Sequence, residues 1–147
     1  MKKVIIIALL ILISGCTLAK RTNDKEKKES SDSMNSVNII IDKKEYNLNL
    51  EDNQTVKEFI SLLPISINMN ELNGNEKYGT LDKSLTTNSY NPGTINKGDV
   101  MLYGSNTLVI FYQTFNTSYS YTKIGHIDNL DNLGSNNVEV EIGGNNE

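Results

Sequence analysis

The sequence lacks most of the residues on which common enzyme sites are built. Its 147 residues include no tryptophan, one histidine and one cysteine, so a disulfide within the chain is excluded. The only arginine is Arg21, near the N-terminus. No P-loop, HExxH helix, serine-hydrolase elbow or dinucleotide fingerprint occurs, which excludes the enzyme classes that these motifs mark.

Positive charge is also scarce. The chain has 14 Lys and Arg residues against 18 Asp and Glu residues. Loss of Lys2 and Lys3 with an export signal would leave 12 against 18, a net charge of −6. An acidic protein without a basic stripe repels phosphate backbones, so nucleic acid is not expected as a partner.

The first 15 residues have the pattern of an export signal. Two lysines precede an apolar run, Val4–Ile13, and the small residues Ser14-Gly15 follow it. The run is shorter than the about 20 residues that a membrane-spanning helix needs. It therefore predicts a cleavable signal and not a lasting transmembrane helix.

The single cysteine stands directly after this signal. The stretch Leu12-Ile13-Ser14-Gly15-Cys16 resembles the lipobox of bacterial lipoproteins. That resemblance implies cleavage before Cys16, a diacylglycerol on its sulfur, and anchoring to the extracytoplasmic face of the cell membrane. Stable anchoring takes at least two acyl chains. An ordinary secretory signal with an incidental cysteine is the alternative.

A polar segment separates the cysteine from the rest of the chain. Lys20–Ser36 has mixed charge, several serines and almost no apolar residues, so it cannot bury enough surface to offset the entropy of ordering it. Binding to anionic lipid is the alternative to a solvated spacer. We therefore predict a signal peptide at 1–15, a lipidated cysteine and flexible tether at 16–36, and one domain at 37–147.

The domain is predicted to consist mainly of short β-strands. Tyr46, Leu48 and Leu50 alternate with polar residues, which is the two-residue period of a half-buried strand. Residues 71–96 contain turn signals such as Asn73-Gly74 and are predicted to be rich in loops. Strands are predicted at 37–41, 45–50, 65–69, 99–103, 107–112, 121–127 and 138–142.

One helix is predicted after the second strand. Thr55 and Glu58 have the spacing of a capping box, apolar residues follow at helical spacing as far as Leu63, and Pro64 ends the element. A helix this short must pack its apolar face on a sheet to be stable. Many short strands, one or two short helices and no βαβ rhythm predict an all-β fold, a closed antiparallel barrel.

Three stretches resemble the bacterial cyclophilin-like family of small domains, namely LLPISINMNELNGNEKYGTL, INKGDVMLYGSNTLVIFYQTF and KIGHID. Their order carries the resemblance: a leucine–proline helix end, an Asn-Gly-Asn-Glu-Lys loop, Gly-Asp before a hairpin, and an Ile-Phe-Tyr strand. With the leading strands and the helix, it covers essentially all of 37–142. It implies an eight-stranded barrel capped by helices, the fold of the prolyl isomerases.

The catalytic pattern of that family is missing. Cyclophilin catalysis depends on a strand arginine in a Phe-His-Arg context and on a groove built by a Met-Gln-Gly-Gly-Asp-like segment, and the domain contains neither. Lysine lacks the planar fork of arginine and is no equivalent. Carried over residue by residue, the groove-lining strand of the family matches only Phe111, Tyr112 and Gln113. No catalytic residue is therefore predicted.

Aromatic residues are concentrated around this strand and the loop after it. Phe111, Tyr112, Phe115, Tyr119 and Tyr121 are predicted to form one cluster. Barrel core and rim is one explanation of the cluster. The functional alternative is a groove that stacks on a peptide or a small apolar ligand, since tyrosine combines an apolar face with a polar tip. For that alternative the predicted ligand-binding residues are Phe111, Tyr112, Gln113 and Phe115.

The remaining chemically active residues favour structural explanations. His126 is expected to be a strand histidine that is hydrogen-bonded or faces solvent, because a zinc site needs three or four ligands and few lie near it in the sequence. Glu76 and Lys77 are expected to form a surface ion pair of little energetic consequence. No metal site and no cofactor is predicted.

Together these patterns predict a lipoprotein whose cyclophilin-like barrel binds a peptide or small ligand without catalysis. Two alternatives remain open at this point: an envelope folding helper similar to a prolyl isomerase, and a structural interaction module of the cell envelope.

Overall fold

The computed structural model describes residues 35–143. The predicted signal peptide, Cys16 and the tether up to residue 34 lie outside the described residues. Within residues 35–143, no helix has both the length and the apolar character needed to cross a membrane.

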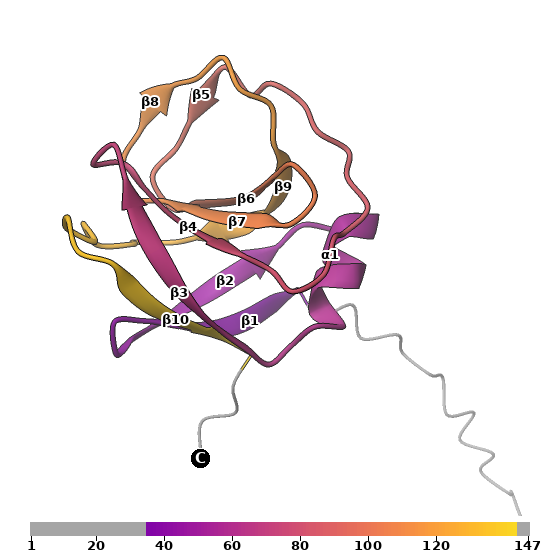
Figure 1. Cartoon of the computed structure of the whole chain (residues 1–147), viewed down its shortest axis with the longest axis horizontal. Coiled ribbons are helices and arrows are strands. Elements are labelled where there is room, and N and C mark those ends of the chain that lie inside the picture. Colours follow the sequence, from indigo (N-terminus) through magenta and orange to yellow (C-terminus); the bar gives the residue numbers. More distant parts are fainter. Residues whose placement is uncertain (1–34, 144–147) are drawn as a thin grey trace, which may run out of the picture. The chain divides into compact units, whose positions relative to one another are not determined.

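Eight strands close into an antiparallel barrel (Figure 1). They are β1 Ser36–Ile41, β2 Lys44–Leu50, β3 Ile65–Leu72, β4 Glu76–Thr80, β6 Asp99–Tyr103, β7 Thr107–Phe111, β9 Thr122–Ile127 and β10 Val138–Ile142. Their order around the barrel is β1-β10-β3-β4-β7-β6-β9-β2. Closure pairs every strand on both sides and leaves no open edge. The predicted fold class, an all-β closed antiparallel barrel with a short helix, is confirmed.

A second, smaller sheet lies beside the barrel. It consists of β5, Thr94–Ile95, and β8, Phe115–Asn116, which pair with each other. Figure 1 shows this pair above the outer face of β6 and β7. The sequence did not predict either strand, because two residues are too short for a period to be recognised.

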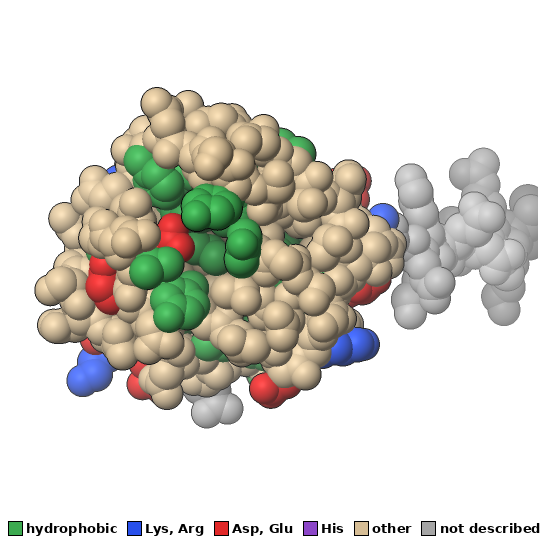
Figure 2. Space-filling model, turned by 45° about the horizontal axis from the view of Figure 1, so that its top comes forward, with side chains coloured by type: hydrophobic (Ala, Val, Ile, Leu, Met, Phe, Trp, Pro, Cys, Tyr) green, Lys and Arg blue, Asp and Glu red, His purple; other side chains and the backbone are tan. Residues whose placement is uncertain are grey.

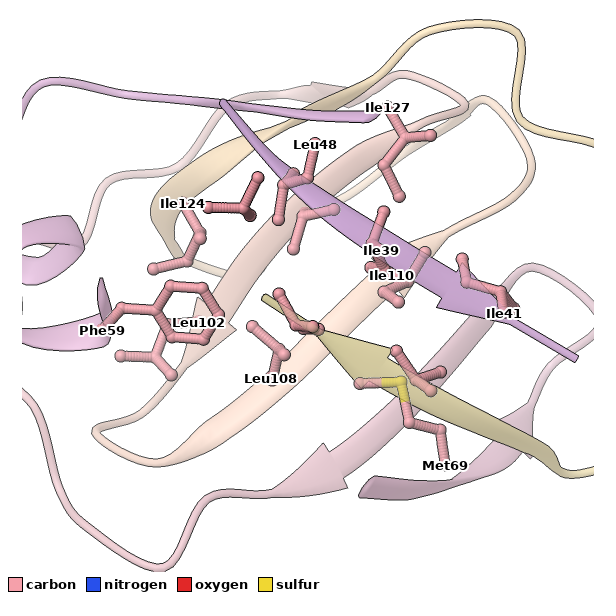
Figure 3. Close-up of a cluster of buried hydrophobic side chains, with 14 of the residues drawn as sticks. Ile39, Ile41, Leu48, Phe59, Met69, Leu102, Leu108, Ile110, Ile124 and Ile127 are labelled. Atoms are coloured by element: carbon pink, nitrogen blue, oxygen red, sulfur yellow. The ribbon is translucent and has the colours of Figure 1, made fainter. Parts of the chain in front are cut away.

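The single described helix, α1 (Gln54–Ile60), is shorter than predicted and packs onto the barrel core. Its Phe59 side chain is completely buried and lies with barrel residues in the main apolar cluster (Figure 3). All barrel strands except β4 contribute apolar side chains to this cluster. The labelled members in Figure 3 are Ile39, Ile41, Leu48, Phe59, Met69, Leu102, Leu108, Ile110, Ile124 and Ile127.

The predicted capping box is wrong. Asn53 is the N-cap, and its Oδ1 accepts a hydrogen bond of 2.8 Å from the amide of Val56. Thr55 instead donates to the carbonyl of Thr86, and the Glu58 carboxylate accepts from the amide and the hydroxyl of Thr86. The two predicted capping residues therefore fix the loop after β4 against the helix, a contact that local spacing does not reveal.

The prediction of a loop-rich segment at 71–96 is also wrong in part, because residues 76–80 form the barrel strand β4. The positions of β4 that point inward are Lys77 and Gly79, so the strand shows no apolar alternation. Gly79 is required by space: a Cβ atom there would lie 2.4 Å from Cγ2 of Ile67 on the neighbouring β3. The pattern that identifies the other strands is therefore absent from this one.

Candidate ligand groove

Strand β7 is apolar from Leu108 to Phe111 because both of its faces are covered. Leu108 and Ile110 belong to the core inside the barrel, whereas Val109 and Phe111 belong to a second buried cluster on the outer face. This division follows from the alternation of side chains along a strand. The second cluster consists of Ile95, Met101, Val109, Phe111 and Tyr121, with Tyr78 and Phe115 packed against it.

A groove of about 570 Å³ lies over this outer face. Strands β4, β6 and β7 line one side of it, and β8 with the segment that follows lines the other. In Figure 2, hydrophobic side chains gather around a hollow on this face, with acidic side chains beside them. The volume lies within the range of ligand-binding pockets.

Five aromatic rings form a continuous row along the groove and beneath it. Tyr119 meets Tyr103 edge to face at a centroid distance of 6.2 Å, and Tyr103 lies 5.7 Å from Tyr121. Phe111 connects the row onward, at 5.4 Å from Tyr121 and 5.7 Å from Phe115. These distances are those of favourable aromatic pairs. We call Tyr119, Tyr103, Tyr121, Phe111 and Phe115 the aromatic row.

Exposed apolar surface is concentrated at the same place. Within residues 35–143, the exposed large hydrophobic side chains are Leu72 at 42%, Tyr103 at 47%, Tyr119 at 62% and Tyr90 at 46%. The first three line the groove, and Tyr90 does not. The groove therefore exposes to solvent three large apolar side chains, which folded proteins commonly bury or cover with a partner.

The structure separates the four residues predicted to bind a ligand. Phe115 lines the groove, and Phe111 lies completely buried beneath it as part of the aromatic row. Tyr112 points the other way, into the barrel, where it belongs to the main core cluster. Gln113 is half-buried and outside the groove lining. The predicted aromatic cluster is therefore wrong in including Tyr112, and it lacked Tyr103, which a different strand contributes.

A buried ionic network surrounds Tyr112 inside the barrel. The ammonium of Lys77 is 2.8 Å from a carboxylate oxygen of Glu71 and donates to the carbonyls of Gly134 at 2.6 Å and Asn136 at 2.7 Å. It also lies 5.0 Å from the centre of the Tyr112 ring. The predicted surface pair of Lys77 with its neighbour in sequence is thus wrong: the Lys77 side chain is 0% exposed and pairs with β3.

The same network explains the pKa values of its acids. Burial raises the pKa of Tyr112 to about 12, and the hydrogen bond of 2.6 Å that its hydroxyl donates to Glu71 acts in the same direction. Burial also opposes the charge of Glu71. The hydrogen bonds from Lys77 and Tyr112 outweigh that effect and lower the pKa of Glu71 below its ordinary value. The network is therefore a satisfied structural element with no group left to act on a ligand.

Glu76 has a different environment from Glu71. It begins β4, lines the groove and is half-buried there. Burial raises its pKa above the ordinary value, and the nearby charge of Glu71 raises it further. From the sequence, Glu76 is expected only as the partner of Lys77. Strand alternation is the signal that separates the two, because adjacent residues of a strand point to opposite faces.

His126 lies on β9, as predicted, and its Nδ1 is 3.0 Å from a carboxylate oxygen of Asp99. The prediction of a hydrogen-bonded strand histidine is therefore confirmed. Among residues 35–143, no three or more His, Cys, Asp or Glu side chains are grouped so that they could hold a metal ion.

Comparison with known proteins supports the barrel assignment. Residues 39–143 match the model of a family described as the cyclophilin-like family. The fold is also similar to the solution structure of a hypothetical protein from Archaeoglobus fulgidus, with a TM-score of 0.50 and 19% sequence identity. That similarity covers 73% of this chain and 92% of the archaeal chain. A search of curated proteins gave no match.

Proposed function

This chain belongs to the cyclophilin-like family, and from that premise we propose that it is a membrane-anchored lipoprotein that binds a peptide or small ligand in the groove without catalysis. The observation that carries the binding proposal is the convergence of Leu72, Tyr103 and Tyr119 on one concave surface. Exposed apolar side chains grouped around a hollow are typical of ligand and partner sites.

A fold by itself does not imply an activity, so the residues of the site distinguish binding from catalysis. The domain has no arginine, and the half-buried acid of the groove is Glu76. A carboxylate has no donor when ionised and is no substitute for a guanidinium. These residues favour binding over prolyl isomerisation. The following experiment distinguishes these two functions.

We expect a short peptide with a central Xaa-Pro bond to bind the full chain in detergent micelles, as measured by chemical-shift changes in ¹H-¹⁵N spectra. Tyr119→Ala should weaken this binding about tenfold, a loss within the range found when an aromatic side chain that a ligand covers is truncated. Tyr90→Ala removes a comparably exposed tyrosine outside the groove and should leave the affinity unchanged.

Equal affinities for the two variants would contradict the groove proposal. Exchange spectra of the same samples test the alternative, since uncatalysed isomerisation takes tens to hundreds of seconds. Exchange cross-peaks between the cis and trans peptide, seen only with protein present, would favour an isomerase-like folding helper.

The membrane anchor is proposed on the sequence around Cys16, which lies outside the described residues. We expect Cys16→Ala to abolish metabolic labelling of the chain with a fatty acid and to leave the precursor uncleaved. Thr17→Ala, at the neighbouring position, should label normally. Labelling of Cys16→Ala at the level of the unchanged chain would refute the anchor.

A further inference from the structure

The groove contains one carboxyl group among its aromatic side chains. In the strand ladders, Glu76 of β4 lies opposite Leu72 of β3 and Phe111 of β7. Directly opposed residues of antiparallel strands point to the same face of the sheet, so Glu76 shares the outer face with the aromatic row. Among residues 35–143, it is the only member of the groove lining that carries a formal charge.

This carboxyl group has no cation beside it. Within the described part of the chain, Glu76 makes no ion pair and its side chain accepts no hydrogen bond. The nearest ammonium on its own strand, that of Lys77, points into the barrel and is taken by Glu71. Partial burial and the neighbouring Glu71 both disfavour the ionised form of Glu76 and raise its pKa. A cation bound in the groove would offset both effects.

Other features of the groove also suit a cation. Four tyrosines line it, and the face of an aromatic ring attracts an ammonium or guanidinium group within about 6 Å of the ring centre. A second acceptor, Oδ1 of Asn75, is buried in the groove wall and has no hydrogen-bond partner within residues 35–143. The groove lining thus contains two acceptors without a donor among the described residues, the Glu76 carboxylate and Oδ1 of Asn75, whereas lysine and arginine side chains carry donors only.

We propose that the groove binds a basic side chain, lysine or arginine, of an extended polypeptide partner. The inference rests on the binding function proposed above and specifies its ligand. The apolar stem of the side chain would pack along the tyrosines while its charged end reaches Glu76, as long basic side chains commonly do.

A polypeptide fits better than a free amine for two reasons. The groove volume of about 570 Å³ is that of a drug-sized ligand, and the rim carries the uncharged polar residues Asn73, Thr117 and Ser118, which can bond peptide groups. The excess of 18 acidic over 14 basic residues in the chain also favours approach of a basic partner.

The test compares three peptides that differ at one position, acetyl-Ala-Ala-Xaa-Pro-Ala-Ala-amide with Xaa as lysine, norleucine or glutamate. Norleucine keeps the apolar stem and removes the charge. Binding to the full chain in detergent micelles is measured by chemical-shift titration. We expect the lysine peptide to bind about tenfold more tightly than the norleucine peptide, and the glutamate peptide to bind most weakly.

Two variants identify the group responsible. Glu76→Gln keeps the shape of the side chain and should reduce the preference for lysine over norleucine to about equal affinity, without weakening the norleucine peptide. Glu141→Gln removes the same charge from an exposed position of β10 outside the groove lining and should keep the preference.

The outcomes separate this inference from the binding proposal. Equal affinities of the lysine and norleucine peptides for the unchanged chain would overturn the basic-ligand inference and leave a groove for apolar ligands. A preference for lysine over norleucine that persists in Glu76→Gln would also overturn the basic-ligand inference, because a group other than Glu76 would then recognise the lysine charge. Binding of none of the three peptides would overturn both the inference and the proposal that the groove takes peptides.

Discussion

Replacing Lys77 by methionine is expected to lower the free energy of unfolding by about 3–5 kcal/mol, the usual cost of removing one partner from a buried ion pair. Methionine keeps the apolar stem and removes the ammonium. The charge of Glu71 and the carbonyls of Gly134 and Asn136 would then lose their common donor inside the barrel. A buried polar group left without a partner costs about 1–3 kcal/mol, more than the net contribution of a typical hydrogen bond.

Urea unfolding of the full chain in detergent, followed by the near-ultraviolet circular dichroism of its tyrosines, measures this effect. The matched control is Lys44→Met, which breaks a surface ion pair with Asp131 whose side chains are 61% and 54% exposed. Solvent screens such a pair, so we expect little change. Equal stabilities of the two variants would show that the network around Lys77 contributes no stability.

Replacing Phe59 by alanine is expected to cost about 3–5 kcal/mol, because it removes a completely buried ring and leaves a cavity. Phe59 and Val56 are the residues of α1 that belong to the core cluster, and Phe59 is the larger of the two (Figure 3). With 7 residues the helix is too short to be stable alone. We therefore expect the variant to lose both core packing and the docking of α1.

The same unfolding measurement on Lys57→Ala serves as the control for Phe59→Ala. Lys57 lies on α1 with a 66% exposed side chain, and alanine is a better helix former than lysine. Unfolding free energies that are the same for Phe59→Ala and Lys57→Ala would mean that the helix does not contribute to the barrel core. Hydrogen exchange of the α1 amides would show directly whether the helix has detached.

Some residues of the groove could be predicted from the sequence. Those that could not share one property: they lie on other strands. The segment from Phe111 to Tyr121 stood out because its aromatic residues are close together in the chain. Tyr103 and Glu76 did not, since they come from other strands and reach the groove only through the pairing of β4, β6 and β7. Contiguity along the chain was therefore a poor guide to which residues share a face.

The two-residue period of β7 is sufficient to place Tyr112 inside the barrel. Leu108 and Ile110 point into the barrel, and a strand period of two places Tyr112 with them and Phe111 on the opposite face. The aromatic residues of this segment therefore belong to two clusters on opposite faces of the strand. The same reasoning separates Glu76, in the groove, from Lys77, in the barrel interior.

By itself, the sequence determined the fold class and most of the strands. Their apolar residues recur at every second position, and this period reflects a local geometry that every strand with one buried face must satisfy. The tertiary structure alone decided the identity of β4, the cap of α1 and the burial of Lys77. In each case the partner that stabilises the residue lies on another segment: Ile67 of β3 for Gly79, Thr86 for the expected capping residues, and Glu71 for Lys77. A polar or small residue has no local pattern that predicts burial, because its burial depends on a partner that only the closed barrel supplies.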